Sequence, residues 1–203
     1  MIIDSRYKVI ENLGSGLYAN VYKVQDIRTG KIYSLKLFHR LEASSVYDEL
    51  NAEAMHQITK LRHPNLLHIY SFGNMDTHIY YLAEYYQGKT LKNFRFSLSN
   101  CHVFYDLIAQ ICYALDALHN QNILHKDIKP ENIMYQLTGD KIQVKVLDYG
   151  FSKIDTERNQ QKISGTLPYI APETYSGKGS SPESDFYALG VTLYFILTGT
   201  LPF

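Results

Sequence analysis

One short run of the chain, Ile-Leu-His-Lys-Asp-Ile-Lys-Pro-Glu-Asn-Ile-Met at residues 123–134, places several polar side chains between apolar flanks. Its functional groups include the carboxylate of Asp127, the amine of Lys129 and the amide of Asn132. Phosphoryl transfer needs a carboxylate that orients and deprotonates the attacking hydroxyl, cations on the phosphates, and oxygen ligands for magnesium. The run offers all but one of these groups, so it is a candidate for this chemistry.

Three further sites could complete such chemistry, although each is weak evidence alone. Asp148 follows an apolar, strand-like run and precedes a glycine turn, a position that suits a second magnesium ligand. The glycine-rich run at residues 13–21, Leu-Gly-Ser-Gly-Leu-Tyr-Ala-Asn-Val, would let a hairpin backbone approach phosphate oxygens. Lys36 lies in a strand-like run, where an exposed structural lysine is the commoner interpretation.

The hydrophobic pattern predicts two different settings for these residues. Short β-branched and aromatic runs separated by glycines predict three strands in an antiparallel meander, at about 7–13, 21–26 and 32–38. Residues 45–61 have helical spacing, and two more strands are expected at 67–72 and 79–84. After Gly88 the apolar residues follow a helical period, and the segment 185–197 is apolar on nearly every face, which is typical of a helix surrounded by protein.

Composition and charge argue against several classes of protein. In 203 residues, 20 Lys and Arg offset 20 Asp and Glu, so nothing suggests a nucleic-acid partner or an anionic membrane surface. No apolar run approaches the roughly 18 residues of a membrane span, and the N-terminus does not read as a secretory leader. Cys101 and Cys112 lack the spacing of a zinc site or a disulfide framework. We therefore expect a cytoplasmic protein, with the nucleus as the alternative.

The motifs also occur in a recognisable order along the chain. A glycine-rich loop, a strand lysine, the His-Lys-Asp run, Asp-Tyr-Gly at residues 148–150 and Ala-Pro-Glu at residues 171–173 follow one another. This series resembles the eukaryotic-type protein kinase family. The resemblance implies an α+β fold with two lobes. Residues 1–86 would form a small antiparallel sheet with one regulatory helix and would bind nucleotide, and residues 87–203 would form part of a mainly helical lobe with the catalytic loop and the activation segment.

The resemblance implies a role for each residue of the polar run. Asp127 is similar to the catalytic base of the family, and Lys129 to the lysine that steadies the γ-phosphate. Lys129 and the run Gly-Thr-Leu-Pro-Tyr at residues 165–169 resemble the Ser/Thr branch, in which Thr166 would bridge Asp127 and Lys129. Lys126 stands where most members carry an arginine.

The same resemblance implies that ATP and Mg²⁺ are the cofactors. Asn132 and Asp148 match the magnesium ligands, and Lys36 matches the lysine that holds the α- and β-phosphates. The backbone of Glu84 and Tyr86 is similar to the edge that hydrogen-bonds adenine. The other residues expected around the nucleotide are Leu13, Gly14, Ser15, Gly16, Val21, Ser34 and Met134.

The glutamate that pairs with the strand lysine in this family is harder to assign. Counting back from His-Pro-Asn at residues 63–65 without a gap puts Ala54 at its position. A one-residue bulge in the helix would place Glu53 there instead, and such bulges occur at functional sites. We expect Glu53 to pair with Lys36, and Glu49, about one turn earlier, is the alternative.

The larger lobe of the family continues beyond the Leu-Pro-Phe corner at residues 201–203, so the resemblance implies a truncated helical lobe. Its apolar helix faces would then need a partner or self-association to cover them. We expect a Ser/Thr kinase that transfers the γ-phosphoryl group of MgATP to a hydroxyl of a protein substrate. The alternatives are a pseudokinase or ATP-binding scaffold, and an inactive kinase fragment.

Overall fold

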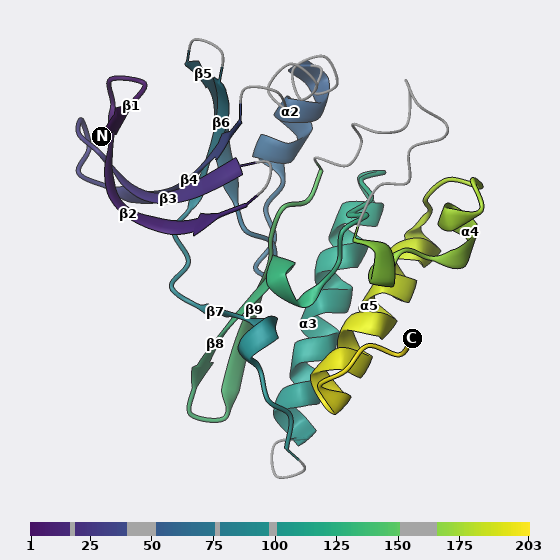
Figure 1. Ribbon diagram of the computed structural model, residues 1–203. Coiled ribbons are helices and arrows are strands. Elements are labelled where there is room, and N and C mark those ends of the chain that lie inside the picture. The colour runs from purple at the N-terminus through teal and green to yellow at the C-terminus, as the bar shows by residue number, and fades with distance from the viewer. Residues whose placement is uncertain (17–18, 40–51, 76–77, 98–100, 151–165) are drawn as a thin grey trace. The chain divides into compact units, whose positions relative to one another are not determined.

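The computed structural model describes residues 1–16, 19–39, 52–75, 78–97, 101–150 and 166–203 (Figure 1). The chain divides into two compact units. The first contains Met1–Arg62 and Leu67–Tyr86, and the second contains His63–Leu66 and Gln87–Phe203. A curled antiparallel sheet dominates the first unit and the long helices lie in the second, which confirms the predicted α+β class.

The first unit is built on a six-stranded antiparallel sheet in the order β1-β2-β3-β4-β6-β5. Its strands are β1 (Ile2–Ile3), β2 (Tyr7–Ser15), β3 (Ala19–Asp26), β4 (Ile32–Phe38), β5 (Ile69–Met75) and β6 (His78–Glu84). The predicted meander is confirmed, because β2 pairs with β3 and β3 with β4 in antiparallel register. Strand β1 was not predicted, because two residues are too few to show an alternating pattern.

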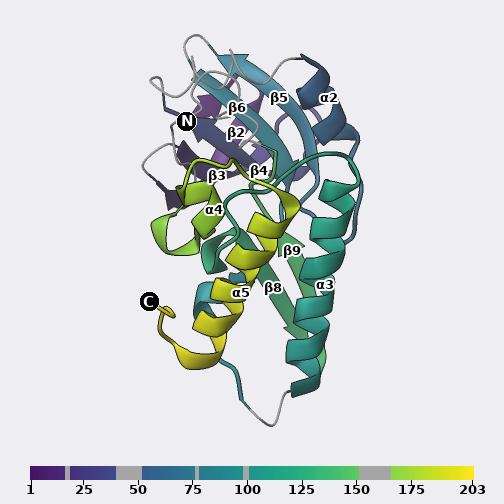
Figure 2. The same cartoon turned by 90° about the vertical axis from the view of Figure 1, so that its right-hand side faces the viewer.

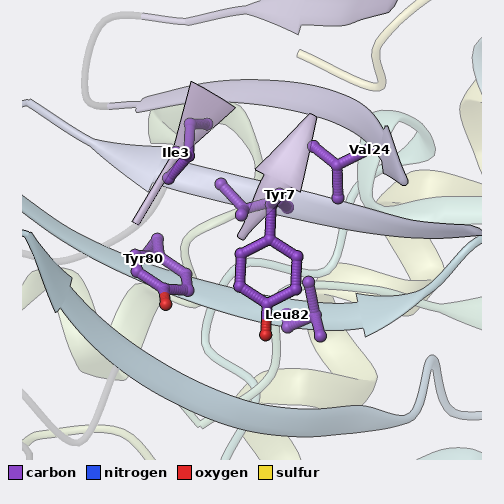
Figure 3. Packing of buried hydrophobic residues seen from close by; sticks show 6 residues of the cluster. Ile3, Tyr7, Val24, Tyr80 and Leu82 are labelled. Atoms are coloured by element: carbon purple, nitrogen blue, oxygen red, sulfur yellow. The ribbon is translucent and has the colours of Figure 1, made fainter. Parts of the chain in front are cut away.

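One face of this sheet carries the hydrophobic core of the unit. Its buried side chains come from strands far apart in the sequence: Ile3, Tyr7, Val24, Leu35, Tyr80 and Leu82. Figure 3 labels five of them, all except Leu35. Helix α2 (Ala52–Lys60) packs on β5 and buries the side chains of Ala54 and Ile58. The start of the helix predicted over residues 45–61 lies outside the described residues.

The second unit contains a three-stranded sheet beside its helices. The sheet has the order β7-β8-β9, with β7 (Lys89–Thr90), β8 (Ile133–Thr138) and β9 (Lys141–Val146). We predicted a mainly helical part and did not predict this sheet, although the alternation in β9 and the Gly139-Asp140 turn are typical hairpin signals. The other elements are η1 (Leu91–Asn93), α3 (Cys101–His119), η3 (Pro130–Asn132), η5 (Leu167–Tyr169), α4 (Pro172–Tyr175) and α5 (Pro182–Thr198).

The helices α3 and α5 lie side by side in both views (Figures 1 and 2). Helix α3 also packs on β9, where the Gln110 side chain bonds the backbone of Ile142 and Val144. Helix α5 starts with a capping box between Ser181 and Ser184 and ends at Gly199, whose positive φ of 78° suits a residue without Cβ. No helix in the described part of the chain has both the length and the apolar character to cross a membrane.

Gly73 on β5 is required by a close approach to the core. A Cβ at this position would lie 2.2 Å from the Cζ atom of Tyr80. The Tyr80 ring cannot easily move away, because it packs edge-on against Tyr7 with ring centroids 5.9 Å apart and its hydroxyl donates to Asp4. Burial and the neighbouring Asp4 carboxylate both raise the pKa of Tyr80, so the hydroxyl keeps its proton for this bond.

We expect Gly73→Ala to destabilise the first unit by about 1–3 kcal/mol, the usual cost of overpacking a core. Chemical denaturation followed by tyrosine fluorescence would measure the change. Gly14→Ala is the matched control, since a Cβ on Gly14 of the same sheet meets no atom within 4 Å. Equal unfolding midpoints for the two variants would contradict the close packing of Gly73 against Tyr80.

Candidate active site

The Asp127 carboxylate lies at the centre of a hydrogen-bonded group in the second unit. Its Oδ2 atom is 2.7 Å from Lys129 Nζ and accepts a hydrogen bond from Asn132 Nδ2 at 2.8 Å. Its Oδ1 atom accepts a hydrogen bond from the Thr166 hydroxyl at 3.0 Å, and that hydroxyl accepts from Lys129 Nζ at 2.7 Å. The structure thus brings four of the predicted residues into direct contact.

The side chain of Asp185 fixes the backbone of the loop that precedes Asp127. Its carboxylate is fully buried and accepts hydrogen bonds from the backbone N–H groups of His125 at 2.9 Å and Lys126 at 2.7 Å. His119 Nε2 lies 2.8 Å from the same carboxylate. A buried carboxylate is tolerated only where its oxygens are satisfied, and these contacts satisfy them. The loop backbone is therefore fixed at both residues that precede Asp127.

The buried imidazole of His125 connects this loop to the segment that carries Asp148. The N–H group of Asp127 donates to His125 Nδ1 at 3.3 Å, so the ring proton sits on Nε2. The Nε2 atom in turn donates to the Leu147 carbonyl at 2.8 Å. A second connection joins the same two segments, because Leu147 N–H donates to the Asn132 carbonyl at 2.8 Å. Asn132 and Asp148 therefore sit on backbone segments that are bonded to each other.

Asp148 has an unusual backbone. Its φ of 57° lies in the left-handed region, which non-glycine residues seldom occupy. The next side chain, Tyr149, is fully buried, and Gly150 follows with a φ of 84°. Such conformations are kept where the surrounding structure fixes them, and they are frequent at functional sites.

The glycine-rich loop lies at the end of β2 in the first unit. Asn12 organises it, because the side-chain Oδ1 accepts from Gly14 N–H at 2.9 Å and Nδ2 donates to the Ser15 hydroxyl at 3.1 Å. Gly16 N–H donates to the Ala19 carbonyl at 2.9 Å. Among the residues that the structure describes, a Cβ on Gly14 would meet nothing within 4 Å. Asn12 was not predicted, although an asparagine side chain that bonds the backbone N–H two residues further on is a common turn feature.

Lys36 lies on β4, between Val21 on β3 and Tyr81 on β6. Its side chain is partly buried, and Nζ lies 5.7 Å from the centre of the Phe38 ring. On α2, Glu53 is exposed and the next residue, Ala54, is buried. The pairing of Glu53 with Lys36 stays a prediction, and Glu49 lies outside the described residues.

The edge expected to bind adenine lies at the end of β6. The Glu84 carbonyl accepts a hydrogen bond from the Ser34 hydroxyl at 2.9 Å, and its side chain accepts from His68 N–H at 2.9 Å. The other residues expected around the base lie on β2, β3, the segment after β6, and β8 of the second unit: Leu13, Val21, Tyr86 and Met134.

Two structural supports of the site were missed from the sequence. His119 ends α3 and contacts Asp185, and Asn65 links α3 to β9 through Gln110 Oε1 at 2.7 Å and the Val144 carbonyl at 3.1 Å. Neither has a local sequence signal, because the partners are far along the chain. Among the described residues there is no cluster of three or more His, Cys, Asp or Glu side chains arranged to hold a metal ion.

The chain was compared with known proteins. It matches the protein kinase domain family over residues 7–203. Curated relatives include the mouse serine/threonine-protein kinase DCLK3, with 32% identity over 99% of this chain, and PrkC of Bacillus subtilis, also with 32% identity over 99%. The Aurora kinase of Saccharomyces cerevisiae is 35% identical over 97% of the chain. The chain spans 26%, 32% and 54% of the lengths of these relatives.

Solved structures agree on the fold. The kinase domain of PknI from Mycobacterium tuberculosis superposes with a TM-score of 0.77 at 22% identity, and the match covers the whole of this chain and 78% of that one. Members of this family generally use ATP and Mg²⁺ and act on protein substrates. The match over nearly the entire chain, together with the shared fold, shows that this chain belongs to the protein kinase domain family.

Proposed function

We propose that this chain carries the catalytic site of a Ser/Thr protein kinase, which transfers the γ-phosphoryl group of MgATP to a Ser or Thr hydroxyl of a protein. The observation that supports this most strongly is the setting of Asp127. Its carboxylate is held by Lys129, Asn132 and Thr166, yet a third of its side chain (33%) is exposed. A carboxylate that is fixed and still accessible can receive a proton from an incoming hydroxyl.

The proposed reaction assigns each group of this cluster one task. Asp127 orients the substrate hydroxyl and takes its proton. The hydroxyl oxygen forms the new bond to the γ-phosphorus, the bond from that phosphorus to the β–γ bridging oxygen breaks, and ADP leaves. Lys129 stands beside the base, so its ammonium group would stabilise charge on the transferred phosphoryl group. Thr166 holds Asp127 and Lys129 at a fixed separation.

Asn132 and Asp148 are the proposed magnesium ligands. The Asn132 Nδ2 atom donates hydrogen bonds to two oxygens of Asp127, the backbone carbonyl and Oδ2. These bonds distinguish the amide nitrogen of Asn132 from its oxygen, so Oδ1 is the atom that faces away from Asp127. One amide oxygen and one carboxylate suit Mg²⁺, which keeps waters and substrate phosphates as its remaining ligands. Bound Mg²⁺ would neutralise charge on the phosphates.

The nucleotide-binding residues of the first unit are proposed from their local geometry. The Gly14 and Gly16 backbone would take the phosphates, because a Cβ on Gly14 would meet no atom of the described residues within 4 Å. Lys36 would hold the α- and β-phosphates, and Glu53 would support Lys36. The Glu84 carbonyl and the Tyr86 backbone would bind the adenine edge, with the base contacted by Leu13, Val21 and Ser34. Met134 belongs to the second unit, and its contact with the base stays a prediction.

One observation favours a second candidate function, that of an ATP-binding pseudokinase. Glu53 is exposed, and Ala54 takes the buried position on the same turn of α2. An exposed glutamate would orient the Lys36 ammonium group, and with it the phosphates, less firmly than a glutamate held by packing. Nucleotide would then bind, but the phosphoryl group would transfer slowly or not at all.

The cellular location is proposed from the two cysteines, and the partners from the exposed side chains of α5. Cys101 and Cys112 are not joined in a disulfide, which is usual in a reducing compartment and supports a cytoplasmic or nuclear location. On α5, the side chains of Phe186, Tyr194 and Leu197 are exposed. We propose that a partner protein or a second copy of the chain covers them, and light scattering of the purified chain would detect the second case.

Asp127→Asn keeps the shape of the side chain but removes its capacity to accept a proton. We expect transfer of labelled phosphate from MgATP to a generic protein substrate to fall by about 100- to 10,000-fold. The thermal shift produced by MgATP should remain. The exposed Asp140→Asn in the turn between β8 and β9 is the matched control and should leave transfer unchanged. Wild-type transfer by Asp127→Asn would contradict the proposed base. A wild-type chain that shows the MgATP shift without transfer would favour the pseudokinase.

Asp185 is proposed as a positioning residue for this base. Asp185→Asn replaces one acceptor oxygen with an NH₂ group, which then faces a backbone N–H or His119. We expect kcat to fall with little change in MgATP affinity, and the amides of His125 and Lys126 to exchange hydrogen about 10- to 100-fold faster. Glu183→Gln, an exposed change in the same helical turn, is the control. Unchanged exchange at both amides would show that Asp185 does not hold the loop.

A further inference from the structure

A short basic segment lies next to the loop that carries Asp127. It consists of Lys89 on β7, Lys92 in η1, and Arg95, all three exposed, and no acidic residue occurs between positions 87 and 97. Both β7 and η1 pack against η3, which follows Asp127 by three residues. We call these three residues the 89–95 basic segment. Its charge is therefore close to the proposed site of transfer within the same unit.

Glu131 is the acidic residue of η3, and the basic segment already pairs with it. Lys92 Nζ lies 3.2 Å from Glu131 Oε1, with 62% of the lysine side chain and 44% of the glutamate side chain exposed. An exposed carboxylate four residues after the base would otherwise attract a basic side chain of a peptide substrate. The lysine of the chain itself occupies that position, so a basic residue of the substrate would have to displace it.

Glu131 also lies close enough to the base to matter for a bound peptide. The pKa of the Tyr169 hydroxyl is raised mainly by burial, and the negative charges of Glu131 and Asp127 raise it further. Both carboxylates therefore act on the same phenol. A side chain that reaches Glu131 would belong to a residue near the acceptor hydroxyl.

The two remaining cations give the segment a net positive charge. The Arg95 guanidinium donates to the carbonyls of Lys92 at 3.0 Å and Phe94 at 2.9 Å, which holds its charge beside η1. Lys89 is on the neighbouring strand, with no acidic neighbour between residues 87 and 97. An approaching basic peptide would be repelled here, whereas a carboxylate or phosphate would be attracted.

We propose that the 89–95 basic segment selects substrates that carry anionic side chains near the acceptor hydroxyl, and that Lys92 prevents Glu131 from recruiting basic ones. The inference rests on the proposed kinase function, because it names the substrate class of that same site. The anion can be a carboxylate of Asp or Glu or a phosphate already on the substrate. Each exposed charge pair is weak, so the preference is about two- to fivefold for each anionic residue.

The test compares peptides that differ only in charge. A serine acceptor in a neutral sequence receives Glu, phosphoserine, Gln or Lys at each flanking position, and kcat/KM is measured at low and high salt. We expect the anionic peptides to be preferred over the Gln peptides and the Lys peptides to be the poorest, with smaller differences at high salt. Comparing Glu with phosphoserine separates the two sources of the anion. Equal kcat/KM for all charges would overturn the inference.

Variants tie the preference to these residues. Lys89→Gln, Lys92→Gln and Arg95→Gln combined should remove the preference while keeping transfer to the neutral peptide. Lys92→Gln alone should improve the Lys peptides by about two- to fivefold, because it releases Glu131. Lys141→Gln, an exposed lysine elsewhere in the unit, is the matched control. A preference that survives the triple change would overturn the inference.

Failure of the proposed function has a different signature. Absence of transfer to every peptide would contradict the kinase activity. The charge preference would then be measured as the binding of a fluorescent acidic peptide to the wild-type chain and to the triple variant. Tighter binding by the wild-type chain, by about two- to fivefold for each anionic residue, supports the inference without turnover. Equal binding would overturn it.

Discussion

The buried carboxylate of Asp185 is the constraint on which the second unit depends. It receives two backbone N–H groups of the loop and the imidazole of His119, so it joins the start of α5, the end of α3 and the residues just before Asp127. An unpaired carboxylate in this position would be costly, and an unpaired loop backbone would be as well. Each group thus requires the other, and the loop cannot change its path without breaking both.

From this fixed loop the remaining contacts follow in sequence. The His125 ring bonds the Leu147 carbonyl and so ties the loop to the segment before Asp148. Asn132 bonds Leu147 through its backbone and Asp127 through its side-chain amide. Thr166 arrives from a distant part of the chain and closes the group around Asp127 and Lys129. Few of these bonds join residues that are close in sequence. The Asp127 carboxylate is therefore held by the side chains of Lys129, Asn132 and Thr166, and backbone hydrogen bonds join the segments on either side of it.

The first unit solves a different problem, which is to expose backbone. Its sheet buries a compact core, in which Gly73 makes room for Tyr80. At the glycine-rich end of β2, a Cβ on Gly14 would meet no atom of the described residues within 4 Å. Asn12 shapes that end through two hydrogen bonds within the loop. Stability comes from the packed face of the sheet, and the glycine-rich end of β2 is the part proposed to bind phosphates.

Much of this could be predicted from the sequence, because local patterns carry local information. The glycine spacing, the strand pattern of the meander and the polar run around Asp127 identified the α+β class and the candidate residues. The β7-β8-β9 sheet was missed, since helical periodicity elsewhere in that part dominated the interpretation. Only the tertiary structure decided that Asp185 contacts His119 and that Lys92 forms an ion pair with Glu131. It also decided that Ala54 is buried and Glu53 is exposed. The reason is physical: hydrogen bonds, ion pairs and burial depend on which distant segments meet, and a sequence pattern reports only the period of its own segment.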